Sequence, residues 1–239
     1  MTSTPRLDPC DALAFGPHPD DVEIGVGGTL LRLIAAGRSA SIVDLTHGEM
    51  GSRGTADERR AEAAAAAKAL GLRQRTNLGI ADTKVAVDDT QTDLVVAAIR
   101  QARPTILFAP HERDLHPDHT AAALLVSRAY FLAGLAKHAP HLGAPHRPRL
   151  VLRFPGNLPV EPSLVVDISA VAKAKDDVVR CYRSQLAPPD RGHLLQGIDV
   201  LERAQVRDRF FGARIGVFAG EPLWHDGPLP VRDAALLMV

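Results

Sequence analysis

The strongest constraint on the fold is an alternation of short apolar runs with longer helix-like segments in the first half of the chain. Apolar runs of strand length lie at 12–16, 40–45 and 105–109. The segments with helical character lie at 26–36, 56–70, 93–102 and 119–136. Strands that alternate with helices are typical of βαβ units. We therefore predict an α/β fold of Rossmann-like architecture, with a mostly parallel sheet and helices on both faces.

The second half of the chain gives a weaker pattern. We expect strands at 150–154 and 164–168, and helices at 171–185 and 197–211. The proline-containing stretches 138–149 and 186–192 are expected to be loops. No internal repeat is visible, so we predict a single domain that spans residues 1–239.

The charge balance excludes several classes of partner. Lys and Arg total 28, Asp and Glu total 28, and the formal net charge is therefore zero. A neutral chain has no electrostatic basis for binding nucleic acid or an anionic membrane surface. The most apolar long stretch, 120–136, is interrupted by Ser127 and Arg128 and is too short to span a bilayer. The N-terminus shows no secretory signal and the two cysteines form no CxxC pair, so we expect a cytoplasmic protein.

Two short motifs carry the chemistry of the chain. His18-Pro19-Asp20-Asp21 follows the first predicted strand, and His116-Pro117-Asp118-His119 follows the third. In an open parallel sheet, ligands bind beyond the carboxyl ends of the strands, so both motifs are expected to meet at one site. Imidazoles and carboxylates together suit a divalent first-row metal, and Zn²⁺, Fe²⁺ and Mn²⁺ all accept them.

Other interpretations of these motifs remain open at this point. His-Pro-Asp is a common loop tripeptide, and Pro117 fits the first position of a helix with His116 beside it. The glycines at 25, 27 and 28 lack the spacing of a dinucleotide fingerprint, so we interpret them as close backbone packing near the metal. Two histidines with one carboxylate are also the triad of non-haem Fe(II) oxygenases, although those sites are usually found in all-β barrels. A non-catalytic sugar-binding protein would have no need for Asp20 beside Asp21.

Three segments resemble a known family. HPDD at 18–21, "LTHGEMGSRGT" at 45–55 and HPDH at 116–119 are similar to the LmbE/PIG-L-type metal-dependent N-deacetylases. Segments 44–82 and 103–126 resemble the bacillithiol-biosynthesis deacetylases within that family. The resemblance covers roughly residues 10–220. Pro17 stands where the family usually has Ala, and the tail 221–239 matches less well.

The resemblance implies an enzyme and a set of roles. The activity would be hydrolysis of a linear amide by a zinc-dependent N-deacetylase. The implied metal ligands are His18, Asp21 and His119. The implied catalytic residues are Asp20 as the general base for the attacking water, His116 at the oxyanion or the leaving amine, and Asp118. Asp118 would orient and charge His116, or would simply be an acid in the first turn of a helix.

The substrate implied by the resemblance is a small N-acetylglucosaminide, namely N-acetylglucosaminyl-malate. Four residues are candidates for binding it: Glu49, Arg53, Arg113 and Asp114. Arg53 suits the malate carboxylate through a bidentate pair. The alternatives are the same chemistry on another amino sugar such as chitobiose, or an amidase acting on bacillithiol S-conjugates. The resemblance also implies a homo-oligomer, often a hexamer in that subgroup.

Overall fold

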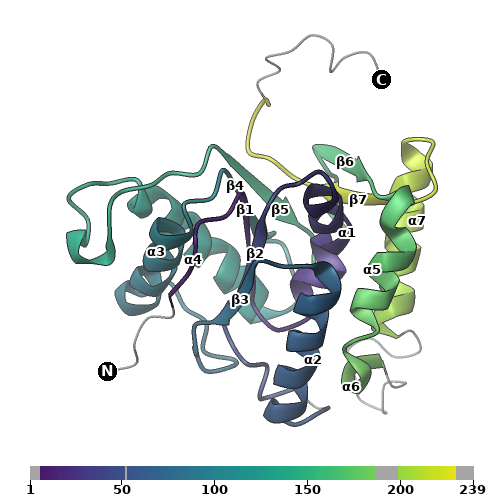
Figure 1. The fold of residues 1–239 in the computed structure, drawn as a ribbon, viewed down its shortest axis with the longest axis horizontal. Helices are drawn as coiled ribbons and strands as arrows, with labels where there is room; N and C mark the ends of the chain where they lie inside the picture. Colours follow the sequence, from purple (N-terminus) through teal and green to yellow (C-terminus); the bar gives the residue numbers. More distant parts are fainter. Residues whose placement is uncertain (1–5, 52, 187–198, 230–239) are drawn as a thin grey trace.

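The computed structural model describes residues 6–51, 53–186 and 199–229, and Figure 1 shows a sheet with helices packed on both of its sides. The strands are β1 (Ala12–Gly16), β2 (Ala40–Asp44), β3 (Gln74–Asn77), β4 (Ile106–Pro110), β5 (Leu150–Phe154), β6 (Leu164–Asp167) and β7 (Gly220–Leu223). The α-helices are α1 (Asp21–Ala35), α2 (Ala56–Leu70), α3 (Asp89–Ala102), α4 (Pro117–Ala133), α5 (Ala172–Val179), α6 (Arg183–Leu186) and α7 (Val200–Arg214). Two 3₁₀ turns, η1 (Pro140–Leu142) and η2 (Ser169–Val171), complete the described structure.

The main sheet has five parallel strands in the order β3-β2-β1-β4-β5. The chain runs from β1 outward through β2 to β3, and then returns to the other side of β1 for β4 and β5. β1 and β4 are therefore neighbours at the point where the strand order reverses, which is where such sheets bind ligands. The predicted α/β fold of Rossmann-like architecture is confirmed. β6 and β7 form a separate antiparallel pair.

Burial on both faces explains why the central strands are continuously apolar. All five residues of β1 are buried. Leu13 and Phe15 enter a core cluster that α3 and α4 complete, whereas Ala12 and Ala14 enter a second cluster with residues of α1, α2 and α5. A strand covered on both sides has no polar face to show, so its sequence does not alternate. None of the helices in the described ranges is long and apolar enough to cross a membrane.

Helix α1 corrects the prediction for 26–36. It begins at Asp21, the last residue of the first motif, so Gly25 lies inside the helix rather than before it, together with Gly27 and Gly28. A Cβ at Gly25 would collide with the Phe154 ring of β5, and one at Gly28 would lie 2.8 Å from Ile168 Cδ1. Gly25 and Gly28 do serve close packing, but against these side chains. That packing stabilises a helix which intrinsic propensity disfavours.

Several other boundaries differ from the sequence prediction. β3 was not predicted because its residues are polar and only half-buried. Arg75 holds this edge strand through ion pairs to Asp44 (2.7 Å) and Glu23 (2.5 Å). The predicted helix 171–185 is divided into η2, α5 and α6, and Tyr182 in the break donates a hydrogen bond to Glu23. The first residues of the predicted helix 197–211, and most of the loop 186–192, lie outside the described residues.

The glycines of α1 provide a matched test of this packing. Gly25→Ala should lower the free energy of unfolding by about 1–3 kcal/mol, because overpacking a core outweighs the gain in helix propensity. Gly27→Ala is the control, because its added Cβ would have its nearest neighbour at 3.7 Å. This variant should be unchanged or up to about 1 kcal/mol more stable. Urea unfolding measures both, and equal stability of the two variants would contradict the packing described here.

Candidate metal and catalytic site

The first motif forms the turn between β1 and α1. Asp21 opens the helix, and its Oδ2 accepts a hydrogen bond from the backbone N–H of His18 at 2.9 Å. Asp20 occupies the position before the helix with φ 118°, a backbone conformation that a residue other than glycine rarely adopts. Such strain costs of order 1–3 kcal/mol and persists only where surrounding contacts enforce it. The turn therefore fixes both carboxylates of the motif.

Three side chains converge beyond the carboxyl ends of β1 and β4. Asp21 Oδ2 lies 3.2 Å from His18 Nδ1 and 3.3 Å from His119 Nε2. His119 comes from the first turns of α4, about a hundred residues away in the sequence, and both imidazoles are buried. The predicted meeting of the two motifs at one place is observed.

The second ring nitrogen of each of these two imidazoles contacts a further carboxylate. His18 Nε2 lies 3.1 Å from Asp82 Oδ1 and 3.5 Å from Asp118 Oδ2. His119 Nδ1 lies 3.3 Å from Asp114 Oδ2. Burial, the largest influence, lowers the pKa of both rings, but the surrounding carboxylates raise the pKa of His18 to about 12 and that of His119 to about 10. The cluster is thus strongly acidic and favours positive charge at its centre.

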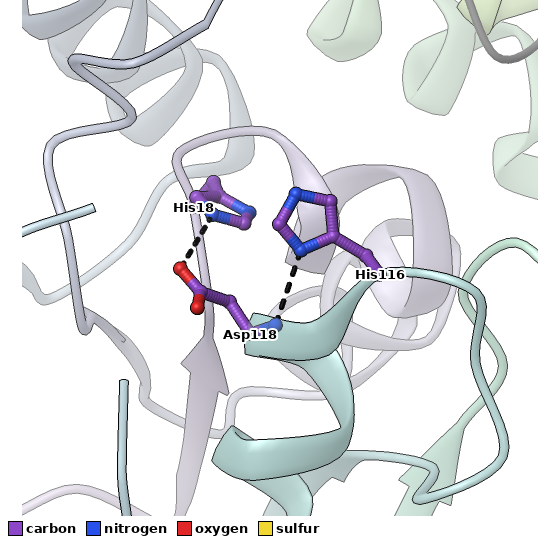
Figure 2. Close-up of side chains that lie close together, drawn as sticks. All are labelled: His18, His116 and Asp118. Carbon is purple, nitrogen blue, oxygen red and sulfur yellow. Dashed lines mark hydrogen bonds and ion pairs between the residues drawn. The ribbon is translucent and has the colours of Figure 1, made fainter. Parts of the chain in front are cut away.

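His116 is placed by the start of α4. It is the residue before Pro117, which takes the first helical position, and its Nδ1 accepts a hydrogen bond from the backbone N–H of Asp118 at 3.2 Å. Figure 2 shows that the Asp118 carboxylate faces His18 instead. That carboxylate also accepts the Thr83 N–H at 2.8 Å. The main chain of Asp118, rather than its carboxylate, therefore orients the His116 ring.

The His116 ring lies close to the rings of His18 and His119. Its centroid lies 4.8 Å from that of His18 and 5.0 Å from that of His119. Burial, and after it the charges of His18 and His119, lower the pKa of His116. This ring differs from its two neighbours in having no carboxylate bound to it among the described residues.

Asp20 lies beside a buried arginine. Arg59 Nη2 is 3.6 Å from Asp20 Oδ2, and the guanidinium is anchored on the carbonyl oxygens of Gly48 (3.0 Å) and Pro19 (2.6 Å). Burial raises the pKa of Asp20 to about 7, although Arg59 lowers it and Asp21 adds to the rise. A carboxylate that exchanges a proton near neutral pH meets the requirement for a general base.

The four predicted substrate-binding residues have different surroundings. Glu49 accepts the backbone N–H of Asp82 at 2.8 Å, and the backbone N–H of Arg113 donates to His111 Nδ1 at 3.0 Å. Asp114 lies behind His119, where it also accepts the backbone N–H groups of His116 and Asn157. None of the four, Arg53 included, is among the described residues that line the cavity at the site.

That cavity has a volume of about 600 Å³ and opens beside the metal-ligand candidates. Three walls contain residues that were not predicted. They are Arg59, Asp82 and Thr83 from the β2–α2 and β3–α3 regions, Gly156, Asn157 and Leu158 after β5, and Val200, Arg203, Ala204 and Arg207 from α7. Asp82 was not predicted because it follows β3, whose polar sequence gave no strand signal. No motif in the sequence links α7 to the site.

The comparisons with known proteins decide the family. Residues 13–130 match the family model described as "PIG-L: GlcNAc-PI de-N-acetylase". The diacetylchitobiose deacetylase of Thermococcus kodakarensis is 31% identical over 76% of this chain and 72% of its own length. This chain belongs to the PIG-L family of deacetylases. A probable N-acetyl-α-D-glucosaminyl L-malate deacetylase of Bacillus cereus is 32% identical over 49% of this chain and 59% of its own length.

Solved structures agree with this PIG-L assignment. A conserved protein from Thermus thermophilus is 42% identical, with a TM-score of 0.83 over 94% of this chain and 97% of its own. The N,N'-diacetylchitobiose deacetylase of Pyrococcus horikoshii is 25% identical, with a TM-score of 0.77 over 89% of this chain and 82% of its own. A 4-carboxy-2-hydroxymuconate hydratase from a Pseudomonas has the same fold at 21% identity, so the fold alone does not determine the reaction.

Gly156 gives a test of how His119 is positioned. A Cβ at Gly156 would lie 2.8 Å from His119 Nδ1 and would collide with the Asp114 carboxylate. Gly156→Ala should separate this pair and lower the affinity of the chain for a divalent metal by about 10–100-fold, as loss of an outer-shell partner typically does. Metal titration with a competing chelator measures the change. Gly27→Ala serves as the control, and equal affinity in the two variants would mean that the Asp114–His119 contact does not support metal binding.

Proposed function

We propose that this PIG-L protein is a zinc-dependent N-deacetylase in which His18, Asp21 and His119 hold the metal. One observation supports the assignment most directly. In each imidazole, one ring nitrogen faces Asp21 and the other contacts a second buried carboxylate. Metal-bound histidines almost always have such an outer partner. Three protein ligands are also the number that a catalytic zinc takes, and Fe²⁺ and Mn²⁺ accept the same donors.

A second group of donors, His18 with His116 and Asp118, also has its atoms within 4.8 Å of one another. Two of its three side chains already accept a backbone N–H, against one, Asp21, in the first group. The Nδ1 of His116 accepts the backbone N–H of Asp118, and the Asp118 carboxylate accepts the Thr83 N–H. This favours the first group as the metal ligands and leaves His116 for catalysis.

The chain supplies the proton transfers that amide hydrolysis needs. A divalent metal held by His18, Asp21 and His119 would lower the pKa of a bound water and polarise an amide carbonyl. Asp20 is the base that takes the proton of the attacking water, and the contact with Arg59 together with the strained turn fixes its direction. His116, whose Nδ1 accepts the Asp118 N–H and which therefore carries its proton on Nε2, faces the oxyanion that develops on the acetyl carbonyl, and the proton that Asp20 takes from water is the one that the leaving amine receives.

The substrate that we propose is N-acetylglucosaminyl-malate, which would place the enzyme in bacillithiol biosynthesis. The resemblance of 44–82 and 103–126 to that subgroup supports it, together with the malate relative from Bacillus cereus. A cavity of about 600 Å³ has room for a sugar with its aglycone. Relatives that act on diacetylchitobiose or on an N-acetylglucosaminyl inositol define the competing substrates. A free-amine assay on these three compounds decides between them.

The first test of the mechanism separates the two aspartates of the motif. Asp20→Asn should keep the metal and lose about 10²–10⁴-fold in kcat, which is the usual contribution of a general base. Elemental analysis and the free-amine assay on the same samples measure both quantities. Asp57→Asn, at an exposed position of α2, is the control. If Asp20→Asn loses metal in proportion to its activity, Asp20 is a ligand and the assigned roles are wrong.

The second test concerns the ligands themselves. His119→Ala should lose the metal as well as the activity, because it removes one of three ligands. His116→Ala should lose activity while keeping one divalent ion per chain. Equal metal contents in wild type and His119→Ala would overturn the ligand assignment, and loss of metal from His116→Ala would favour the second group of donors.

A further inference from the structure

We infer that Arg203 recognises an anionic group on the aglycone of the substrate, and so determines specificity within this site. The inference rests on the proposed deacetylase function and names the substrate class: N-acetylglucosaminides whose aglycone carries a carboxylate or a phosphate. Arg203 lies on α7 and lines the cavity of the site. No sequence motif pointed to it.

The guanidinium of Arg203 is weakly engaged within the chain. Its hydrogen bonds run from Nη1 and Nη2 to a single acceptor, Asn157 Oδ1, at 3.5 and 3.4 Å. It forms no ion pair with any carboxylate in the ranges that the structure describes. Burial and the neighbouring charge of Arg207 lower the pKa of Arg203, and Asp114 only partly offsets them. A cation half-removed from water without a counterion is costly, and an anion in the cavity would remove that cost.

The other two arginines among the described cavity residues are already committed. Arg59 binds the carbonyl oxygens of Gly48 and Pro19 and lies beside Asp20. Arg207 donates to the carbonyl oxygens of Pro155 and Ile24, which ties α7 to α1 and to the segment after β5. The Nε atoms of Arg59 and Arg207 have no hydrogen-bond partner, but both atoms are fully buried, whereas the Arg203 guanidinium is held only by two long hydrogen bonds to one oxygen. A guanidinium presents five N–H donors in a planar fork that matches carboxylate and phosphate oxygens.

A chain of hydrogen bonds links Arg203 to the reacting centre. Asn157 accepts from Arg203 and donates through Nδ2 to Asp114 Oδ1 at 2.9 Å. Asp114 in turn lies against His119 Nδ1. Arg203 therefore stands on the His119 side of the cavity, one amide and one carboxylate removed from a metal-ligand candidate. A substrate with its acetamide at the catalytic cluster can place a group attached to the sugar at Arg203.

A cation at this position would also distinguish between the substrates of the known relatives by their charge. Malate carries carboxylates, whereas the inositol and the second sugar of chitobiose offer only neutral groups. Arg53, which we expected to bind the carboxylate, is not among the described residues lining the cavity. Arg203 on α7 does line the cavity.

Kinetics on three substrates test the inference. The substrates are N-acetylglucosaminyl-malate, N-acetylglucosamine 1-phosphate and the neutral methyl N-acetylglucosaminide. Arg203→Gln should lower kcat/KM for an anionic substrate by roughly 10–150-fold, mainly through KM, as loss of a charge-assisted hydrogen bond predicts. The methyl glycoside should change by less than about threefold, since it has no charge to lose. Arg203→Lys should recover part of the loss. A loss on the malate substrate alone identifies a carboxylate as the recognised group, and a loss on the phosphate alone identifies a phosphate.

Arg209→Gln is the matched control, because Arg209 is exposed on the same helix and stacks on Phe218 away from the cavity residues. It removes the same charge and should leave all three substrates unchanged. Equal losses on the charged and neutral substrates in Arg203→Gln would overturn the inference and assign Arg203 to maintaining the Asn157–Asp114 contacts. No loss on any substrate would overturn it as well.

A binding measurement separates this inference from the proposed function. If wild-type protein hydrolyses none of the three compounds, the deacetylase proposal fails, and calorimetric titration with the same compounds still decides the role of Arg203. Tighter binding of an anionic compound to wild type than to Arg203→Gln, with equal binding of the methyl glycoside, supports the role. Equal binding of every compound to both proteins contradicts it.

Discussion

The carboxylate of Asp21 lies between two imidazoles, and the rest of the site depends on that contact. Its Oδ2 is 3.2 Å from His18 Nδ1 and 3.3 Å from His119 Nε2. A single oxygen therefore joins the segments that follow β1 and β4. The two rings come from separate motifs, one after β1 and one after β4. They can contact the same carboxylate only because β1 and β4 are neighbours in the sheet. The chemistry of the site therefore depends on the strand order of the fold.

Outer carboxylates keep that arrangement rigid. Asp82 and Asp118 hold His18 from one side, and Asp114 holds His119 from another. Each of these acids is itself fixed by backbone N–H groups, from Met50, Thr83 and Asn157 respectively. Gly156 leaves the space in which Asp114 and His119 approach each other. A donor set supported in this way is preorganised, since little has to move when a cation enters.

The sequence alone led to the centre of the site but not to its walls. HPDD and HPDH place their side chains next to buried strands, and the strand pattern predicts which edge of the sheet they share. Asp82 could not be found in the same way, because β3 is polar and is held at the sheet edge by Arg75 rather than by apolar burial. Arg203 could not be found either, since its place depends on how α7 packs across the molecule. Helix α1 was predicted to begin too late because propensity arguments place Gly25 outside a helix, whereas here Gly25 makes room for the Phe154 ring.

The central claim is that the ion binds between His18, Asp21 and His119, and anomalous diffraction tests it most directly. A crystal of the zinc-loaded protein, measured at the zinc absorption edge, should show one strong anomalous peak per chain. The peak should lie about 2.0–2.2 Å from His18 Nδ1, from an oxygen of Asp21 and from His119 Nε2. A peak ligated by His116 and Asp118 instead, or no peak at this end of β1 and β4, would contradict the account.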